Sequence, residues 1–176
     1  MSYMDNSNAA RLVEVYSDMI MRISLMYLKQ TCDAEDICQE VFLKLLTGNL
    51  EFLSYEHEKA WIIRTTINAC KDRRKLAFYK HWSDPPEDER VAVAATPGEG
   101  NGRGLLNEIK KLPKWQRVAI YLYYYEEYQT KEIAEMTGRS VASVQKDLSR
   151  GRKALKELLS SMYDGTYGKG GALNEG

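Results

Sequence analysis

The stretch KEIAEMTGRSVASVQKDLSRGRKAL, residues 131–155, decides the fold of the C-terminal half. Ile133 gives a short first helix its apolar side, and Gly138 can take the positive φ that a tight turn needs. Ser140 can then cap a second helix, on which Val144 and Leu148 share one side as a core seam. This order of elements predicts a helix-turn-helix.

The face of the second helix that lies away from the seam is small and polar at its start and cationic further on. Its residues are Ala142, Lys146, Ser149 and Lys153, with Ser143 and Arg150 beside them. A recognition helix meets base edges near its N-terminus, while its cations contact phosphates. We therefore predict duplex DNA as the ligand, with a basic helical hairpin that touches no DNA as the alternative.

Upstream of this motif, residues 83–104 have the composition of a linker. They hold Pro85, Pro86, Pro97, several glycines and the acidic run Glu87 to Glu89. The sequence thus predicts two small domains, at residues 8–80 and 105–163, joined by a linker at 81–104. A Gly-rich tail, 164–176, is expected to be disordered.

The N-terminal half carries apolar residues at helical spacing. The first series is Leu12, Tyr16, Ile20, Ile23 and Tyr27. A second helix is expected to be capped by Asp33 and to stop at Gly48, and a third to run from about His57 to Lys75 after a loop at 49–56. No segment alternates with period two for long enough to predict a strand, so the predicted fold class is all-α.

The third helix has a mixed aromatic and cationic stripe. With Ile63 set at zero and about 100° per residue, the stripe lies between about 80° and 160° from the apolar side. It consists of Trp61, Arg64, Asn68, Lys71 and Lys75. Such a face can bind phosphates through its cations and bases through its ring or amide, as single-strand binders do. A solvated basic face with Trp61 half buried in the core is the alternative.

The net charge of zero, from 25 basic and 25 acidic residues, conceals a strong segregation. Residues 64–80 hold six bases against Asp72, and residues 139–156 hold six against Asp147. Two separate basic stretches are typical of a chain that meets a polyanion twice. With 44% hydrophobic residues and no long apolar run, we expect a globular intracellular protein without membrane insertion.

The cysteines and the acidic helix give little sign of metal chemistry. Cys32, Cys38 and Cys70 lack metal-ligand spacing, and we expect three buried free thiols and no disulfide. The carboxylates of the second helix, Asp33, Glu35, Asp36 and Glu40, could in principle hold a divalent metal, but no His or calcium loop accompanies them. A docking surface for a basic partner and a plain solvated face are the other interpretations. We predict no metal and no cofactor.

Three strings together resemble the extracytoplasmic-function sigma factors, the small members of the sigma-70 superfamily. They are DAEDICQEVFLKLL at 33–46, AWIIRTTINACKDRRK at 60–75, and the stretch from LPKWQRVAIY at 112 through the helix-turn-helix to 155. The resemblance spans about residues 10–160. Two departures are Ile62, where primary sigma factors have a second aromatic, and Gln129, where a Ser or Thr cap is usual.

The resemblance implies sigma region 2 and sigma region 4, a role in transcription initiation, and site residues in three groups. Core RNA polymerase would dock on Asp36, Gln39, Glu40 and Phe42. The minus-ten element would be recognised and opened by the third helix and the loop before it, through Tyr55, Glu56, His57, Trp61, Arg64, Asn68 and Lys71. The minus-thirty-five element would be read by Arg139, Ser143, Lys146, Ser149 and Arg150.

The resemblance further implies an alternative sigma factor of the cytoplasm, with promoter DNA and an anti-sigma factor as partners and no catalytic chemistry. Two rivals stay open at this point. One is a helix-turn-helix regulator that acts without core polymerase and uses its N-terminal half for dimerisation or sensing. The other is a metal-dependent nuclease built on the acidic helix around Asp36.

Overall fold

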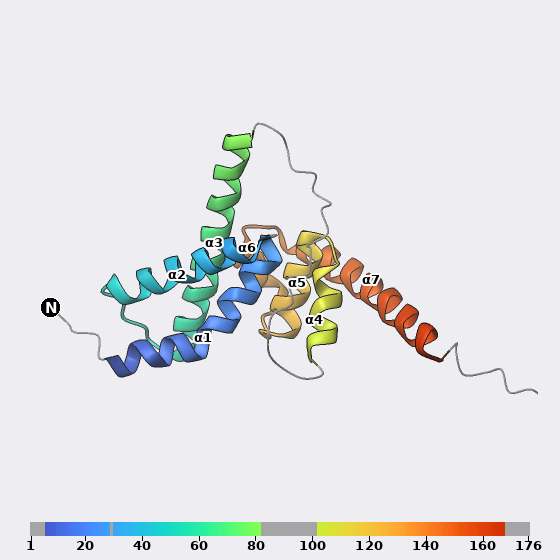
Figure 1. The fold of residues 1–176 in the computed structure, drawn as a ribbon, viewed down its shortest axis with the longest axis horizontal. Coiled ribbons are helices and arrows are strands. Elements are labelled where there is room, and N and C mark those ends of the chain that lie inside the picture. The colour runs from blue at the N-terminus through green and yellow to red at the C-terminus, as the bar shows by residue number, and fades with distance from the viewer. Residues whose placement is uncertain (1–5, 29, 82–101, 168–176) are drawn as a thin grey trace, which may run out of the picture.

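The structure, a computed structural model, describes residues 6–28, 30–81 and 102–167, and every element in these ranges is helical (Figure 1). The helices are α1 (Asn6–Tyr27), α2 (Thr31–Thr47), α3 (Tyr55–His81), α4 (Gly102–Lys110), α5 (Lys114–Tyr124), α6 (Thr130–Thr137) and α7 (Val141–Tyr167). The predicted all-α class is confirmed. Most of the predicted linker lies outside the described residues, and α7 continues through 164–167, where the tail was expected to begin.

Helices α1, α2 and α3 pack against one another through the apolar faces that the sequence predicted. The whole predicted series on α1, from Leu12 to Tyr27, is buried. On α2 the buried side consists of Ala34, Ile37, Val41 and Leu45. On α3, Ile63, Ile67 and Cys70 face the core with no exposed surface.

The ends of two helices differ from the prediction. Asp33 is not the cap of α2, because the helix already begins at Thr31 and Asp33 lies in its first turn, paired with Arg73. Helix α3 begins at Tyr55, so Tyr55 and Glu56 belong to its first turn and not to a loop. The Ser54 side chain accepts a hydrogen bond from the His57 backbone N–H at 3.2 Å, which satisfies one donor of that turn.

The other end of α3 runs on to His81, beyond the predicted end near Lys75. In Figure 1 this last part projects away from the packed helices. Lys75 and Leu76 are exposed there. A projecting helix needs no apolar face, so no periodicity marked it in the sequence.

The expectation of three buried thiols is wrong. All three cysteines are free, but Cys32 is exposed in the first turn of α2 and Cys38 is half buried. Only Cys70 is buried, and its burial raises the pKa of the thiol to about 12. Cys32 and Cys38 lie in an acidic stretch of α2, and such a stretch does not show which side of the start of a helix faces solvent.

The helix-turn-helix has the local geometry that its residues predicted. Gly138 has φ of 69°, and the Ser140 hydroxyl accepts a hydrogen bond from the Ser143 N–H at 3.1 Å. At the start of α6, the Glu132 carboxylate accepts from the Gln129 backbone N–H at 2.8 Å. Glu132 thus supplies the glutamate half of a capping box at the start of α6.

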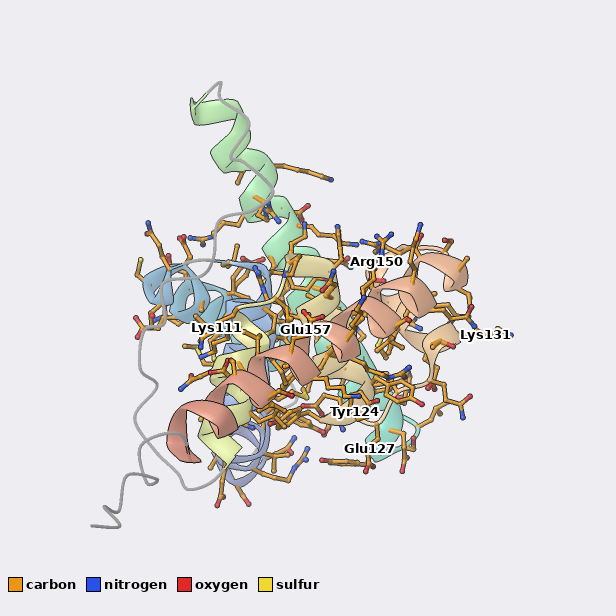
Figure 2. The ribbon with its side chains drawn as sticks, turned by 90° about the vertical axis from the view of Figure 1, so that its right-hand side faces the viewer. Lys111, Tyr124, Glu127, Lys131, Arg150 and Glu157 are labelled. Atoms are coloured by element: carbon orange, nitrogen blue, oxygen red, sulfur yellow. The ribbon has the colours of Figure 1, made fainter. Side chains whose placement is uncertain are left out.

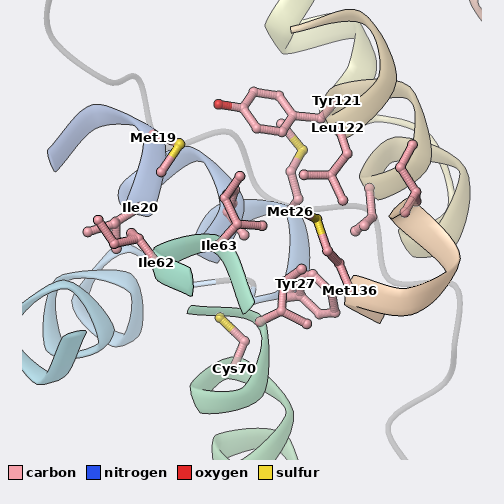
Figure 3. Close-up of a cluster of buried hydrophobic side chains, with 14 of the residues drawn as sticks. Met19, Ile20, Met26, Tyr27, Ile62, Ile63, Cys70, Tyr121, Leu122 and Met136 are labelled. Atoms are coloured by element: carbon pink, nitrogen blue, oxygen red, sulfur yellow. The ribbon is translucent and has the colours of Figure 1, made fainter. Parts of the chain in front are cut away.

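The two halves of the chain share one hydrophobic core. Met26 and Tyr27 of α1 lie beside Tyr121 and Leu122 of α5 and Met136 of α6 (Figure 3). Tyr27 also meets the ring of Trp115 edge to face, with centroids 5.9 Å apart. The helix-turn-helix is therefore packed directly on the N-terminal half.

Candidate nucleic-acid interface

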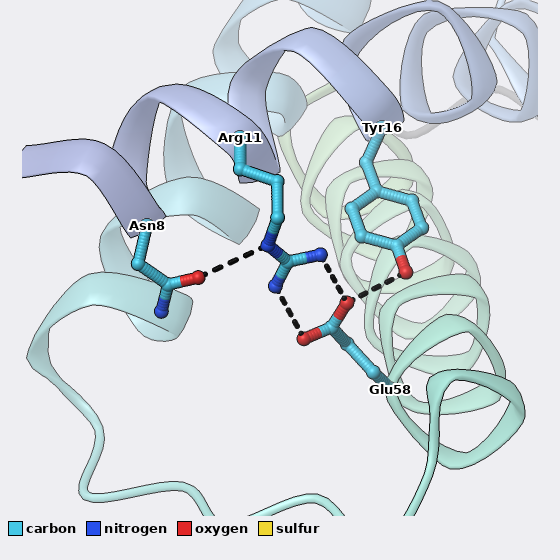
Figure 4. Close-up of polar contacts among 4 residues, drawn as sticks. All are labelled: Asn8, Arg11, Tyr16 and Glu58. Carbon is cyan, nitrogen blue, oxygen red and sulfur yellow. Dashed lines mark hydrogen bonds and ion pairs between the residues drawn. The ribbon is translucent and has the colours of Figure 1, made fainter.

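The start of α3 is fixed to α1 by one carboxylate. Glu58 accepts two hydrogen bonds from the Arg11 guanidinium, at 3.1 and 2.9 Å, and one from the Tyr16 hydroxyl at 2.7 Å (Figure 4). Burial by itself would raise the pKa of Glu58, but the bonds from Arg11 and Tyr16 outweigh it and lower the pKa below its ordinary value. The carboxylate stays ionised and holds the first turn of α3 in place.

The residues predicted to precede the stripe gather around this first turn. Tyr55 is 54% exposed and stacks on Tyr16, with ring centroids 6.1 Å apart. Glu56 is exposed, and the pKa of its carboxyl is lowered by hydrogen bonds from its own backbone and from Ser54. His57 accepts a hydrogen bond from the Leu53 N–H at 3.2 Å through Nδ1. Its imidazole is thus oriented by the preceding loop.

The stripe itself divides into exposed and partly covered members. Arg64, Asn68 and Lys75 are exposed. Trp61 is half buried and meets Phe52 at 5.8 Å between ring centroids. Trp61 is therefore half buried against the core, as the alternative interpretation expected, while Arg64 and Asn68 on the stripe are exposed.

Acceptors from the other half of the chain lie against this cationic side of α3. The Lys71 ammonium donates to the Thr137 carbonyl oxygen at 2.6 Å, and Arg64 lies 3.6 Å from the Glu135 carboxylate. Lys59 pairs with Glu126 at 2.9 Å. The sequence pattern missed Lys59, which falls at about 320° on the wheel and so on the apolar side of α3.

Helix α7 presents the face that was predicted to read duplex DNA. Its exposed residues are Ala142, Lys146, Ser149, Arg150 and Lys153. Figure 2 shows Arg150 on this helix, on the flank away from Tyr124. Ser143 is half buried, and its hydroxyl bonds with that of Ser140 at 2.8 Å. Side chains of the predicted type thus line one continuous surface.

Arg139 lies just before α7, and it is more covered than most of the residues predicted to contact DNA on that helix. Its guanidinium pairs with Asp147 at 2.8 Å and lies over the Trp115 ring, 4.2 Å from the centroid. Its side chain is 22% exposed. The ion pair with Asp147 and the contact with Trp115 therefore hold the Arg139 side chain at the turn of the helix-turn-helix.

Helix α2 carries the predicted docking residues on its outer side. Asp36 pairs with Arg73 at 3.0 Å and Glu40 with Lys44 at 2.8 Å, while Gln39 is exposed and Phe42 is half buried. Leu43, which the pattern missed, is 62% exposed beside them. Within the described ranges no group of His, Cys, Asp or Glu could hold a metal ion.

The structure also reveals an apolar groove that the sequence did not predict. It has a volume of about 480 Å³ and lies between α4, α5 and α7. Its walls include Leu105, Ile109 and Leu155, with Arg152 and Lys156 among the lining residues. Residues of three separate helices line it, with leucines on α4 and α7 and Ile120 on α5, so no single stretch of sequence signals it.

Comparisons with known proteins place both halves in one family. The model of sigma-70 region 2 matches residues 12–77, and that of sigma-70 region 4 matches residues 103–155. The RNA polymerase sigma factor SigZ of Bacillus subtilis is 30% identical over 132 residues, which cover 71% of this chain and 72% of SigZ. The extracytoplasmic-function factor SigW of the same organism is 25% identical, with 90% of this chain and 92% of SigW covered.

A longer relative and two solved structures complete the comparison. The probable sigma factor RfaY of Xanthomonas campestris is 27% identical over 92% of this chain, which spans 42% of the length of RfaY. The sigma factor RpoE of Bartonella quintana, solved with the anti-sigma factor NepR, has a TM-score of 0.64 at 21% identity, covering 86% of this chain and 96% of RpoE. CnrH, solved with the cytosolic domain of CnrY, has a TM-score of 0.54 at 17% identity, covering 90% and 91%.

This chain belongs to the sigma-70 family, in its extracytoplasmic-function group. The match covers the N-terminal half as well as the helix-turn-helix, which does not favour a regulator that uses the C-terminal half alone. Among the helices of the described ranges, none has the length and apolar character to cross a bilayer.

Proposed function

We propose that the protein is an alternative sigma factor that brings core RNA polymerase to specific promoters and assists their opening. One observation carries the proposal: a chain of this family has two separate cationic helix faces, on α3 and on α7, each with polar or aromatic side chains among the cations. The protein would work in the cytoplasm and catalyse no reaction of its own.

In this proposal residues 8–80 act on the minus-ten element. Arg64, Lys71 and Lys75 would contact phosphates, and Trp61 and Asn68 would meet unstacked bases. Tyr55, Glu56 and His57 would line the entrance to this face. The exposure of Arg64, Asn68 and Lys75 supports the assignment, as does the rigid attachment of the first turn through Glu58.

Residues 105–163 would read the minus-thirty-five element as duplex. Ala142, Ser143 and Lys146 stand near the N-terminal end of α7, where a recognition helix meets base edges. Ser149, Arg150 and Lys153 would contact phosphates further along. Arg139 would reach DNA by leaving Asp147, or would position the turn without touching DNA.

Protein partners would bind on other surfaces. Asp36, Gln39, Glu40 and Phe42 would dock on core polymerase, and the exposed Leu43 would extend that contact. RpoE and CnrH were solved with an anti-sigma factor and with the cytosolic domain of CnrY. We propose a protein inhibitor of that kind for this chain as well.

Run-off transcription with purified bacterial core polymerase, followed by sequencing of transcript starts, tests the proposal. Defined start sites that need the chain would support it, and a chain that neither co-elutes with core polymerase nor yields any start would overturn it. In permanganate footprinting of the promoters found in this way, Arg64→Ala should weaken the reactivity of the promoter bubble. The variant should still bind core polymerase. Lys131→Ala, an exposed cation on α6, is the control.

A further inference from the structure

Two cations of the C-terminal half lie on one aromatic ring at the junction between the halves of the chain. The Lys114 ammonium is 4.0 Å from the centroid of the Trp115 ring, and the Arg139 guanidinium carbon is 4.2 Å from it. Trp115 meets Tyr27 at the end of α1, and the Lys114 ammonium is 5.9 Å from the centroid of the Tyr27 ring. These cations therefore lie against the N-terminal half.

Helix α3 brings further cations to the same place. The Lys71 ammonium is 2.6 Å from the carbonyl oxygen of Thr137, close before Arg139 in the chain. Arg74 follows Lys71 by about one turn of α3. Burial and the charge of Arg74 lower the pKa of Arg117 on α5, so these two guanidinium groups repel each other. Cations thus face one another across the junction.

The cations at this junction, here called the junction cluster, are Lys71, Arg74, Lys114 and Arg139. Their charge is poorly balanced, because Asp147 pairs with Arg139 at 2.8 Å but, within the described ranges, no carboxylate pairs with Lys71 or Arg74. Burial and the neighbouring Lys75 lower the pKa of Lys71, so α3 itself adds repulsion. Like charges held this close favour an anion between them.

Two buried donors beside these cations lack an acceptor. In the part of the chain that the structure describes, neither the Tyr27 hydroxyl nor the Arg139 Nε–H has a hydrogen-bond partner. Tyr27 is 2% exposed, among the buried side chains of the junction (Figure 3). Burial and Cys70 raise the pKa of its hydroxyl, whereas Arg139 and Arg74 lower it, so both guanidinium groups lie near this hydroxyl. Buried donors without acceptors are costly, and an anion would supply acceptors.

We propose that the junction cluster binds a small free anion with several phosphate groups, which bridges α3 and the helix-turn-helix half. Its oxygens would accept hydrogen bonds from the Tyr27 hydroxyl and the Arg139 guanidinium. Arg74 and Lys71 would bind it from α3. Charge-assisted bonds of this kind are strong, and guanidinium groups match the geometry of phosphate oxygens. Cations from two sides exceed the charge of one phosphate, which favours an anion that carries more.

A free anion fits this place better than the backbone of a nucleic acid. Lys71, Arg74 and Arg139 are half buried, and Tyr27 is buried between the helices. A narrow polyphosphate can enter when the long, flexible side chains turn aside, whereas a duplex needs an open surface such as that of α7. Duplex binding by α7 should therefore not depend on Arg74.

Isothermal titration calorimetry of the full chain with sodium tripolyphosphate tests the site. The unmodified chain should bind the anion saturably, and Arg74→Met should weaken the affinity about tenfold, because it removes one charge-assisted contact. Lys131→Met removes an exposed cation on the first turn of α6, outside the cluster, and should change the affinity by less than about twofold. Sodium sulfate at the same ionic strength should bind at least about tenfold more weakly than tripolyphosphate.

Thermal unfolding distinguishes an anion site from a structural role of Arg74. Without tripolyphosphate, Arg74→Met removes repulsion from Arg117, so its melting temperature should equal or exceed that of the unmodified chain. Tripolyphosphate should raise the melting temperature of the unmodified chain, because it binds the folded state, and should raise that of Arg74→Met less.

Tyr27→Phe tests the buried hydroxyl and keeps the ring against Trp115. Because the hydroxyl has no acceptor among the described residues, the variant should lose no stability when the anion is absent. It should bind tripolyphosphate about three- to tenfold more weakly, since one hydrogen bond to the anion is lost. Unchanged affinity would contradict the contact assigned to this hydroxyl.

Several results would overturn the inference. They are no binding of tripolyphosphate, equal affinities of Arg74→Met and Lys131→Met, sulfate that binds as tightly as tripolyphosphate, or an anion-free melting temperature of Arg74→Met clearly below that of the unmodified chain. Weaker binding of duplex DNA by Arg74→Met would assign Arg74 to nucleic acid instead. The anion site does not depend on sigma activity, which the run-off assay tests separately.

Discussion

The Arg117 guanidinium on α5 donates to the Met26 carbonyl oxygen at the end of α1, at 2.7 Å and 91 residues away in the chain. It also donates to the Leu112 carbonyl at 2.9 Å, and the residue is 5% exposed. Burial and the nearby Arg74 lower the pKa of Arg117 to about 10, so the group remains charged at neutral pH. One buried cation therefore joins the two halves.

Arg117→Met should lower the free energy of unfolding by about 2–4 kcal/mol. The methionine fills similar space but leaves two buried carbonyls without their donor, each costing about 1–3 kcal/mol. Urea unfolding at pH 7 measures the loss. Arg150→Met, on the exposed face of α7, should change stability by less than about 0.5 kcal/mol. Equal effects of the two substitutions would contradict the structural role of Arg117.

Glu58 should make stability depend on pH in the acid range. Its pKa is lower in the folded chain than its ordinary value of 4.5, so its contribution is present above that value. The contribution is lost as pH falls through the folded pKa, because protonation removes the charge that Arg11 and Tyr16 bind. Glu58→Gln should therefore be less stable than the unmodified chain at pH 7, and the gap should narrow below pH 4.5.

Urea midpoints at several pH values measure this gap. Glu14→Gln replaces an exposed carboxyl on α1 and should run parallel to the unmodified chain. A gap for Glu58→Gln that stays constant down to about pH 3 would show that the carboxylate charge contributes nothing.

Gly151→Ala should destabilise the C-terminal half. Gly151 is buried where α7 crosses α5, and a Cβ there would lie 2.8 Å from Cγ1 of Ile120. Overpacking of this kind costs about 1–3 kcal/mol, against a helix-propensity gain of about 1 kcal/mol. Gly104→Ala on α4 meets nothing within 4 Å and should be neutral or stabilising. Thermal unfolding of the two variants should show shifts of opposite sign or clearly different size.

Lys146→Ala should relax sequence specificity at the upstream promoter element. Lys146 is exposed near the N-terminal end of α7, and loss of a base contact costs about 1–3 kcal/mol of discrimination. Run-off yields from a mapped promoter and from single-base changes in its upstream element measure the effect. Lys156→Ala, which lines the apolar groove, is the control. An equal loss of run-off yield on all promoter sequences would show instead that Lys146 contacts a phosphate.

Local chemistry made much of the fold predictable. Periodic apolar residues identified the buried sides of α1, α2 and α3, and Gly138 and Ser140 identified the turn of the helix-turn-helix. These features depend on neighbours within a few positions in the chain. Helix ends were less certain. Helix α2 begins at Thr31 without a side-chain cap, whereas Ser54 caps the start of α3 and lay in the segment predicted as a loop.

Partners from distant segments were not predictable. The pattern placed Lys71 and Arg139 on DNA-facing surfaces, but Lys71 bonds to Thr137 and Arg139 to Asp147 over Trp115. Lys59 was not predicted as a member of the cationic stripe because it falls on the apolar side of the helical wheel. A helical wheel describes one helix alone and contains no information on which helix covers it.

An all-helical chain with a helix-turn-helix and two cationic faces can be predicted from short stretches of sequence, because periodicity, turn residues and charge are local properties. The position of the end of α6 on the cationic side of α3 is a property of the folded chain alone. That contact depends on the joint packing of residues such as Met26 and Tyr121, far apart along the chain, and short stretches do not encode such pairing.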